Sequence, residues 1–159
     1  MQITTKNIKE RFVVKRTVRF GDTDAAGVMH FHKILPWCHE AYEESLEHFG
    51  IQSTQVFPQP TTVNDNNSNW PSVLLPIIHC SVDYRVPLVC GDNIIIELNS
   101  KIVSFDSFEV YYDIACKKRT VVQAKTRHLA IQAINRQRCN LPTFIHDWID
   151  ILTNDRHLV

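Results

Sequence analysis

Residues 31–50 of the chain read FHKILPWCHEAYEESLEHFG. The apolar residues in this stretch fall at positions 31, 34, 35, 38, 41, 42, 46 and 49, which is the spacing of one face of an α-helix. Gly50 follows as a helix stop, and Pro36 suits the first helical turn, where its missing N–H removes no hydrogen bond. The pattern predicts one long amphipathic helix that begins at about residue 32 or 33.

The segments on either side of this helix predict a strand and a loop. Residues 11–20 alternate apolar and polar side chains, with Val14, Val18 and Phe20 on the apolar side, which is typical of a half-buried strand. Residues 52–71 contain three prolines and four asparagines and show neither a helical nor a strand period. We therefore expect a long loop after the helix.

The rest of the chain predicts four strands and a final helix. Strand patterns cover residues 75–86, 94–103, 108–116 and 120–134. The short segments between them predict antiparallel hairpins. In the last pattern the apolar positions change from even to odd numbers, which predicts a β-bulge near His128. A short amphipathic helix is expected after Pro142.

These elements predict an α+β protein with the hot-dog fold. The long helix is inserted after the first strand of a single antiparallel sheet of five strands. Its apolar face and that of the sheet stay out of water only if the sheet wraps around the helix. The length of 159 residues suits one domain, so we expect residues 1–159 to form a single domain.

The composition excludes several classes of protein. The 17 basic and 17 acidic residues cancel, whereas nucleic-acid-binding domains are usually basic. The apolar stretches are too short for a membrane span, and residues 1–12 contain no apolar segment of signal-peptide length. The five cysteines form no C-x-x-C pair. These features predict a cytoplasmic protein with no nucleic-acid partner and no membrane span.

One motif points to a known family. Residues 20–31 read FGDTDAAGVMHF and resemble the signature of the 4-hydroxybenzoyl-CoA thioesterase-type hot-dog hydrolases, in which an Asp-x-Asp and a glycine lead into the central helix. The resemblance extends to DYR at residues 83–85 and to Pro87, Gly91 and Asp92. Residues 38–46 (CHEAYEESL) are most similar to the branch that hydrolyses 1,4-dihydroxy-2-naphthoyl-CoA in phylloquinone (vitamin K1) synthesis. The resemblance implies an acyl-CoA thioesterase for an aromatic acyl group, assembled as a homotetramer from two dimers.

Asp24 and the start of the helix could form a site for thioester hydrolysis. The reaction needs a group that attacks or activates water, and donors for the negative charge that develops on the carbonyl oxygen. Asp24 lies about seven residues before the expected helix start, and Gly27 lets the loop turn tightly toward the free helical N–H groups. On spacing alone, an ordinary loop or N-cap aspartate is the more frequent interpretation.

The resemblance assigns roles to these residues. It implies that Asp24 is the catalytic carboxylate and that the backbone N–H of Phe31 is the oxyanion donor. It leaves open whether Asp24 attacks the thioester or acts as a general base on water. Gly27 and His30 are expected beside the substrate. Asp22 is expected to stabilise the loop by accepting backbone hydrogen bonds.

We expect no metal site. We also expect no cofactor, because coenzyme A is part of the substrate. Four potential metal ligands lie near the helix start: His30, His32, Cys38 and His39. Their spacing completes no tetrahedral zinc set. The helix also carries four acids, Glu40, Glu43, Glu44 and Glu47. They could include the helix-borne glutamate of another hot-dog branch, but the glycine-rich context of that branch is missing, so a solvated helix face is expected.

The phosphates of coenzyme A need cationic or N–H partners. In the resembled enzymes basic residues cluster at the turn between the third and fourth strands, but here only Lys101 lies near that turn. Residues 114–146 contain seven basic residues and no acid. We favour Arg136 and Arg138 from this stretch as phosphate contacts, with solvated surface charge as the equal alternative.

Two other functions stay open. The acyl group could arrive on acyl carrier protein, which would need a basic docking patch beside the pocket. The chain could also be a non-catalytic acyl-CoA-binding module, although Asp24 and Gly27 argue against this. Met29, Phe31 and Trp37 predict flat, polarizable pocket walls that suit an aromatic acyl group, and the same residues could instead belong to the core.

Overall fold

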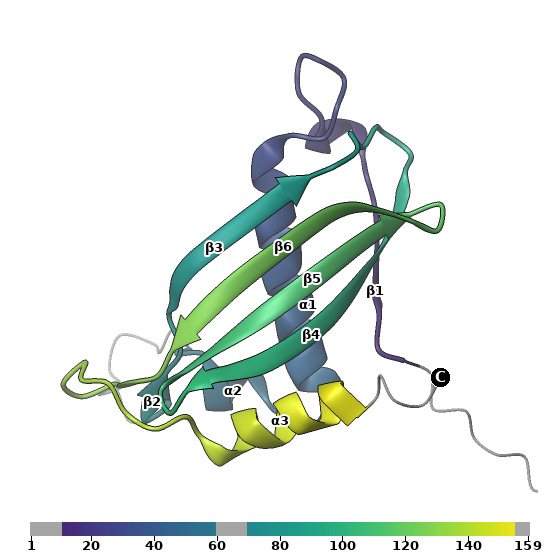
Figure 1. Cartoon of the computed structure of the whole chain (residues 1–159). Coiled ribbons are helices and arrows are strands. Elements are labelled where there is room, and N and C mark those ends of the chain that lie inside the picture. Colours follow the sequence, from purple (N-terminus) through teal and green to yellow (C-terminus); the bar gives the residue numbers. More distant parts are fainter. Residues whose placement is uncertain (1–10, 60–69, 155–159) are drawn as a thin grey trace, which may run out of the picture.

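The computed structural model describes residues 11–59 and 70–154. Helix α1 (Ile34–His48) crosses one face of a five-stranded antiparallel sheet with the order β1-β4-β5-β6-β3, as Figure 1 shows. The strands of this sheet are β1 (Val14–Thr17), β3 (Ile77–Tyr84), β4 (Asn93–Ser104), β5 (Ser107–Cys116) and β6 (Arg119–Leu129). The shorter elements and the last helix are η1 (Phe20–Asp22), η2 (Phe31–Lys33), α2 (Ser53–Val56), β2 (Val73–Leu74), β7 (Ile131–Gln132) and α3 (Thr143–Asn154). This is the hot-dog architecture that the sequence predicts.

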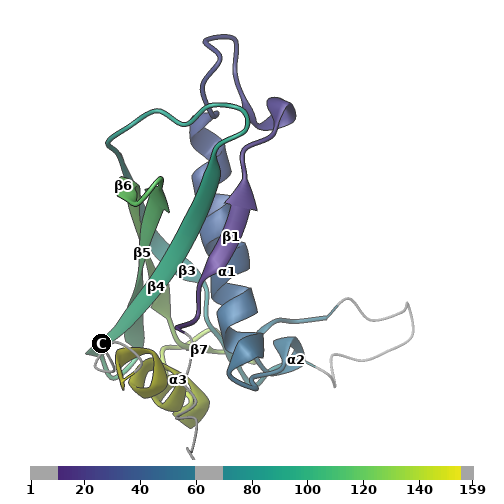
Figure 2. The ribbon, with the colours of Figure 1, turned by 90° about the vertical axis from the view of Figure 1, so that its right-hand side faces the viewer.

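The connection between β3 and β4 differs from the predicted hairpin. β3 pairs with β6 at one edge of the sheet, whereas β4 pairs with β1 and β5. Because both sides of β4 are occupied, β3 finds a partner only beyond β6, and residues 85–92 cross the end of the sheet (Figure 2). In this crossing the C=O of Leu88 accepts a hydrogen bond from the N–H of Met29 at 2.7 Å. The crossing therefore holds the end of β3 against the loop that precedes α1.

Helix α1 buries the stripe that the sequence predicts. Its buried side chains are Ile34, Cys38, Ala41, Tyr42, Ser45 and Leu46. After the helix, Gly50 adopts a left-handed conformation with a φ of +87°, and its N–H donates to the Glu47 C=O at 3.0 Å. The Ile51 N–H donates to the Leu46 C=O at 2.9 Å. These two bonds form a Schellman motif, which confirms the predicted glycine stop. The helix begins one or two residues later than predicted, directly after η2.

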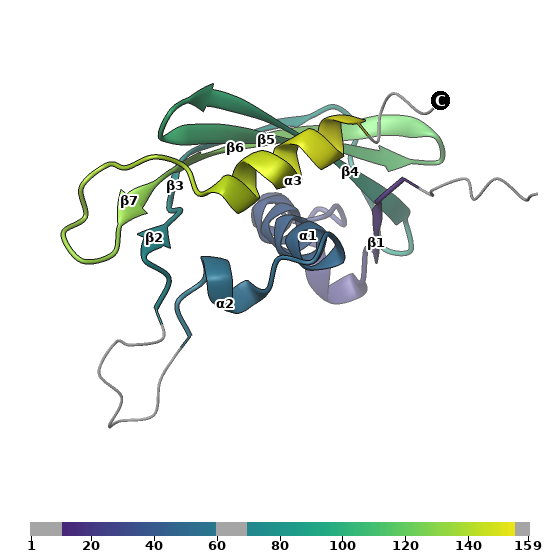
Figure 3. The same ribbon diagram turned by 90° about the horizontal axis from the view of Figure 1, so that it is seen from below.

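Helix α3 covers the lower end of the core, beneath α1 and the sheet (Figure 3). Its buried side chains are Ile145, Trp148, Ile149 and Leu152. The indole Nε1 of Trp148 donates to Oγ of Ser45 on α1 at 3.0 Å. The amphipathic helix predicted after Pro142 is confirmed.

The first strand is shorter than predicted. β1 covers only Val14–Thr17, and Val18 is then held by backbone hydrogen bonds to Gly91 and Asp92 as the chain turns away. Phe20 lies in η1 with 83% of its surface exposed, instead of in the core. The apolar spacing predicted burial at Phe20, but burial depends on a partner strand that is not present at that position.

The predicted bulge near His128 is wrong for β6. The pairing of β6 with β5 shifts at the opposite end of the strand, where Val121 and Val122 are both buried. His128 keeps the even-numbered burial pattern and is 1% exposed. A buried polar residue at an even position, rather than a bulge in this strand, interrupts the apolar phase. The register shift opposite His128 belongs to β3.

The loop predicted at residues 52–71 is partly helical. Helix α2 places Val56 in the core with 2% of its surface exposed. A single helical turn is too short to produce a readable period, which is why the sequence does not predict it. Residues 60–69 of the predicted loop lie outside the described residues. None of the helices in the described parts of the chain is long and apolar enough to cross a membrane.

Candidate active site

The loop between η1 and η2 forms a small hairpin with Asp24 at its turn. The Asp24 N–H donates to the Val28 C=O at 2.9 Å, and the Gly27 N–H donates to the Asp24 C=O at 3.0 Å. Gly27 has a φ of +75°, a conformation that side-chain-bearing residues rarely adopt, so the expected tight turn is present. The carboxylate Oδ1 of Asp24 accepts from the Ala26 N–H at 2.8 Å and stays exposed. The loop therefore fixes Asp24 while leaving its carboxylate open to a ligand.

Asp22 stabilises this loop, as the sequence predicts. Its Oδ2 accepts from the Arg19 N–H at 2.8 Å, and its Oδ1 lies 3.1 Å from Nζ of Lys33. The hydrogen bond from the Arg19 backbone is the main reason why the pKa of Asp22 lies below its ordinary value. The Asp22 C=O also accepts from the His30 N–H at 2.8 Å. Asp22 thus connects the two ends of the hairpin.

A pocket of about 360 Å³ lies between this loop and the end of β3. The residues that line it are Asp24, Val28, Met29, Phe31, Tyr84, Arg85, Val86, Pro87, Leu88 and Val122. The hydroxyl of Tyr84 donates to the Phe31 C=O and joins β3 to the start of the helical segment. Asp24 and Phe31, the two predicted catalytic residues, therefore lie on the wall of one pocket.

The backbone N–H of Phe31 is the first of η2, which continues directly into α1. The hydrogen bonds around it use other groups: the Lys33 N–H donates to the His30 C=O at 3.0 Å, and the His32 N–H donates to Nδ1 of His30 at 3.4 Å. Within the described residues the Phe31 N–H has no acceptor. An N–H at the start of a helical segment carries partial positive charge and suits a developing oxyanion.

The structure does not place His30 on the wall of this pocket. Its ring lies against the rings of Phe31 and His32, at centroid distances of 4.7 and 4.1 Å, and its Nδ1 contacts Nδ1 of His32. Across residues 11–59 and 70–154, no three His, Cys, Asp or Glu side chains are grouped so that they could hold a metal ion.

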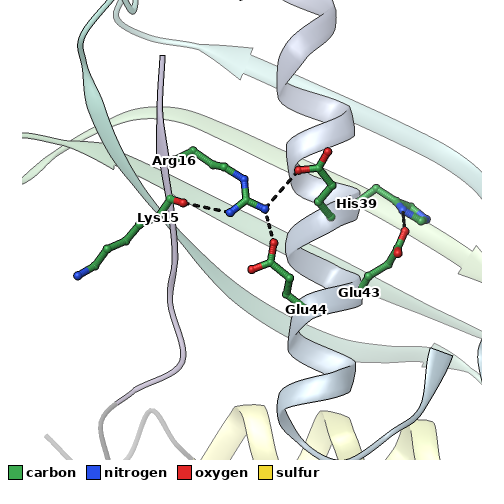
Figure 4. Close-up of polar contacts among 6 residues, drawn as sticks. Lys15, Arg16, His39, Glu43 and Glu44 are labelled. Atoms are coloured by element: carbon green, nitrogen blue, oxygen red, sulfur yellow. Dashed lines mark hydrogen bonds and ion pairs between the residues drawn. The ribbon is translucent and has the colours of Figure 1, made fainter. Parts of the chain in front are cut away.

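The acidic face of α1 holds the edge strand β1. Nη2 of Arg16 on β1 contacts Oε1 of Glu44, as Figure 4 shows, and lies 3.2 Å from Oε2 of Glu40. Glu43 Oε1 pairs with Nδ1 of His39 at 2.6 Å. None of the four acids lines the Asp24 pocket. The expected solvated face is thus partly used to attach β1 to α1.

The three predicted phosphate-binding cations lie away from this pocket. Lys101 faces Glu109 in the β4–β5 pairing, and Nη1 of Arg138 lies 3.7 Å from Oδ2 of Asp106 in the hairpin between these strands. Arg136 lies in the turn after β7 and lines a second, mostly apolar pocket. One copy of the chain does not bring these cations to Asp24.

Sequence reasoning missed Tyr84 and Arg85 as pocket residues. The motif at residues 83–85 marks these two residues in the sequence. The predicted hairpin between β3 and β4, however, does not place them near Asp24. The crossing of residues 85–92 is what places both residues beside Asp24. Nη2 of Arg85 donates to Oε1 of Gln123, whose Nε2 donates to Oδ1 of Asp113 at 2.7 Å.

Comparison of the sequence and the fold with known proteins shows the family to which the chain belongs. The model of the thioesterase-like superfamily matches residues 18–149, which include the Asp24 loop, α1 and every strand of the sheet except β1. The chain belongs to this superfamily. The resemblance at residues 20–31 is therefore confirmed at the level of the family.

Relatives within the superfamily cover nearly the whole chain. The 1,4-dihydroxy-2-naphthoyl-CoA hydrolase of Prochlorococcus marinus (strain MIT 9303) is 44% identical over 144 residues, which are 91% of this chain and 93% of that protein. The enzyme of the same name from Synechococcus sp. (strain CC9902) is 48% identical over 140 residues, 88% of this chain and 90% of that protein.

Solved structures of thioesterases share the fold. A crystal structure from Prochlorococcus marinus strain MIT 9313, assigned as a thioesterase, superposes with a TM-score of 0.79 at 44% identity, covering 87% of this chain and 93% of that chain. Slr0204, a 1,4-dihydroxy-2-naphthoyl-CoA thioesterase from Synechocystis, superposes with a TM-score of 0.73 at 28% identity. The superposition covers 89% of this chain and 97% of that chain. The superfamily match and these superpositions agree on a hot-dog thioesterase.

Proposed function

We propose that the protein hydrolyses 1,4-dihydroxy-2-naphthoyl-CoA to 1,4-dihydroxy-2-naphthoate and CoA, a step of phylloquinone synthesis. One observation carries the proposal: the Asp24 carboxylate and Phe31, whose N–H begins the helical segment, lie on the wall of one pocket. Relatives that are 44% and 48% identical over about nine tenths of the chain, and that carry this activity in their names, support it. The catalytic unit is the single domain of residues 1–159.

The reaction follows from the positions of these two groups. The thioester carbonyl oxygen points to the Phe31 N–H, which holds the negative charge that develops when the carbonyl carbon is attacked. In one route a carboxylate oxygen of Asp24 attacks, CoA leaves as the thiolate and takes a proton from water, and a second water hydrolyses the mixed anhydride. In the other route Asp24 removes a proton from the attacking water and then gives it to the leaving thiolate. Both routes need the ionised carboxylate.

The pocket walls suit a flat acyl group. Most of the lining is apolar, and Met29, Phe31 and Tyr84 offer polarizable or flat surfaces around a volume of about 360 Å³. Trp37, which the sequence suggested as another wall, packs against the core instead. Gly27 and His30 do not line the pocket. Gly27 forms the turn beside Asp24, and the His30 side chain caps η2, which begins at Phe31. A bicyclic aromatic ring fits such walls better than a long saturated chain.

The proposed enzyme acts in the cytoplasm as a homotetramer. β3 forms an open edge of the sheet, and nearly all of its residues are exposed, including Ile77 and Ile78. Phe31, on the pocket wall, is 71% exposed, and Phe20, in η1, is 83% exposed. An open strand edge and exposed aromatic rings favour pairing with further copies of the chain. None of Lys101, Arg136 and Arg138 lines the pocket, so this structure does not support them as partners of a thioester bound there.

A panel of purified thioesters tests the function. We expect kcat/KM for 1,4-dihydroxy-2-naphthoyl-CoA, or for benzoyl-CoA as a stable aromatic analogue, to exceed that for palmitoyl-CoA by at least ~10-fold, or about 1.4 kcal/mol. An equal or higher value for palmitoyl-CoA would contradict the aromatic assignment and leave a thioesterase. Faster hydrolysis of the acyl carrier protein ester would assign a different carrier. Binding without turnover of any ester would assign a non-catalytic module.

A further inference from the structure

The end of the molecule opposite the Asp24 loop carries an unusual exposed surface. Ile134, in the turn after β7, is 93% exposed and is the most exposed large apolar side chain among the described residues. Phe105, at the tip of the β4–β5 hairpin, is 64% exposed, and Val103 beside it is 41% exposed. Large apolar side chains that are exposed to solvent at two neighbouring loop tips indicate a surface that binds a partner.

The two loop tips form one surface. The Leu141 N–H donates to the Phe105 C=O at 2.9 Å, and the Ala130 N–H donates to the Asp106 C=O at 2.7 Å. The segment 130–141, which contains β7 and the turn after it, thus starts and ends at the β4–β5 hairpin. Figures 1 and 3 show both tips at the same end of the sheet. We call this area, formed by Lys101, Val103, Phe105, Ile134, Arg136 and Arg138, the Ile134 surface.

The charged groups that face solvent on the Ile134 surface are cations. Lys101 and Arg136 are exposed, and the side chain of Arg138 is 70% exposed. The two acids of the β4–β5 hairpin, Asp106 and Glu109, are only 4% and 3% exposed. Glu109 is already bound by Arg127 and Lys125, and the first turn of α3, which follows the loop, carries no acid.

We propose that the Ile134 surface docks the protein on an anionic lipid bilayer. Ile134 and Phe105 enter the boundary between headgroups and acyl chains, and the three cations bind lipid phosphates around them. A second copy fits the surface poorly, because a two-fold contact would bring like charges together. The phosphates of CoA offer the same anionic chemistry, but CoA provides no apolar layer to receive Ile134. The Asp24 pocket lies at the other end of α1, so docking leaves it open to soluble substrate.

Vesicle sedimentation of the full chain tests the proposal. Vesicles of phosphatidylcholine that contain phosphatidylglycerol should bind the protein, vesicles of phosphatidylcholine alone should bind it much less, and added salt should weaken binding because it screens the cations. Equal binding to both kinds of vesicle, or binding to neither, would overturn the proposal.

Variants with matched controls locate the contact. Ile134→Ser should weaken the partition into anionic vesicles by at least ~10-fold, because a buried aliphatic side chain is lost. Arg136→Gln combined with Arg138→Gln should weaken it by roughly 25-fold, since each cation near an anionic surface contributes about fivefold. Val89→Ser, in the crossing beside the Asp24 pocket, and Lys117→Gln combined with Lys118→Gln, in the β5–β6 turn, should leave the partition unchanged. Equal weakening by these controls would show unspecific attraction and refute the assignment.

Two further readouts identify the competing occupants. If Ile134→Ser changes the mass in light scattering but not the partition into vesicles, the surface is a contact between copies and the proposal fails. If the arginine variants raise KM for an acyl-CoA but not vesicle partition, the cations serve CoA and the proposal fails. Vesicle binding is measured without substrate, so its result does not depend on the proposed function.

Discussion

The two ends of helix α1 are built from the same kinds of side chain but differ in what covers them. At the start of the helical segment Phe31 and Tyr84 are 71% and 47% exposed beside the Asp24 pocket. Three turns later Tyr42, His128 and Trp148 are each at most 1% exposed, enclosed by α1, the sheet and α3. At the open end the Phe31 N–H has no acceptor among residues 11–59 and 70–154, and the closed end supplies the packing that keeps the helix in place. Chemistry and stability are therefore separated along one helix.

The closed end holds its polar atoms tightly. The ring of His128 stacks on Phe108 at 4.7 Å with an interplanar angle of 8°, and its Nε2 lies 3.0 Å from Oγ1 of Thr126. Burial lowers the pKa of His128 to about 4. The hydroxyl of Tyr42 is buried without a hydrogen-bond partner in the described residues, and burial raises its pKa. This end is therefore suited to neutral side chains only.

The largest expected effect on stability is at Trp148. Trp148→Ala removes a fully buried ring that packs at 5.5 Å on Tyr42 and at 6.1 Å on Phe108, together with its bond to Ser45. We expect the free energy of unfolding to fall by about 3–5 kcal/mol, measured by urea denaturation. Phe31→Ala removes a comparable ring from the open end and should cost less than about 1 kcal/mol. Similar losses in both variants would contradict the contrast between the two ends.

The next effect is a dependence of stability on pH that comes from His128. Its pKa is about 4 in the folded protein and 6.5 in an unfolded chain, so the unfolded state takes up a proton first as the pH falls. The stability contributed by neutral His128 is complete above pH 6.5 and is lost toward pH 4. The loss should reach about 2 kcal/mol at pH 5 and about 3 kcal/mol at pH 4.

Replacing this histidine removes the effect. His128→Gln should lower stability at pH 7 but flatten its change between pH 7 and pH 5 in urea titrations. His146→Gln, which replaces an exposed histidine on α3, should leave the loss of stability between pH 7 and pH 5 the same as in the original protein. An unchanged slope in His128→Gln would mean that other groups cause the pH dependence.

A smaller effect is expected at the open end. Tyr84→Phe removes the hydroxyl that donates to the Phe31 C=O, which should cost about 1 kcal/mol of stability or less. Because this bond joins β3 to the residue that carries the oxyanion donor, kcat/KM should fall several-fold. Tyr111→Phe deletes a hydroxyl that donates to Glu109; neither residue lines the pocket, so this variant should leave kcat/KM unchanged. If both variants had the same kcat/KM, the assignment of Tyr84 to the active site would be contradicted.

Local patterns predicted the two long helices, α1 and α3, well. The stripe from Ile34 to Leu46, the stop at Gly50 and the helix after Pro142 depend on neighbours in sequence, and the structure confirms them. The Asp24 turn is equally local, since Gly27 and the hydrogen bonds within the hairpin form it. These features need no knowledge of distant strands.

Features that depend on distant partners were not predictable in the same way. The end of β1 and the exposure of Phe20 depend on where β4 stops pairing, and the role of Tyr84 depends on β3 lying beyond β6. The buried His128 interrupts the apolar pattern, and one partner of its ring, the Leu75 C=O, lies 53 residues away in the sequence, where periodicity does not reveal it. The other partner, Thr126, lies two residues earlier on the same strand.

The most direct measurement is the turnover of Asp24→Asn with 1,4-dihydroxy-2-naphthoyl-CoA. An amide keeps an Oδ1 that can accept from the Ala26 N–H, so the hairpin and the unfolding midpoint should stay as they are. It can neither attack the thioester nor take a proton, so kcat should fall by at least ~100-fold. Asp150→Asn, an exposed acid on α3, serves as the control and should keep full activity. Turnover close to the original in a folded Asp24→Asn protein would contradict the assignment of the chemistry to the open end of α1.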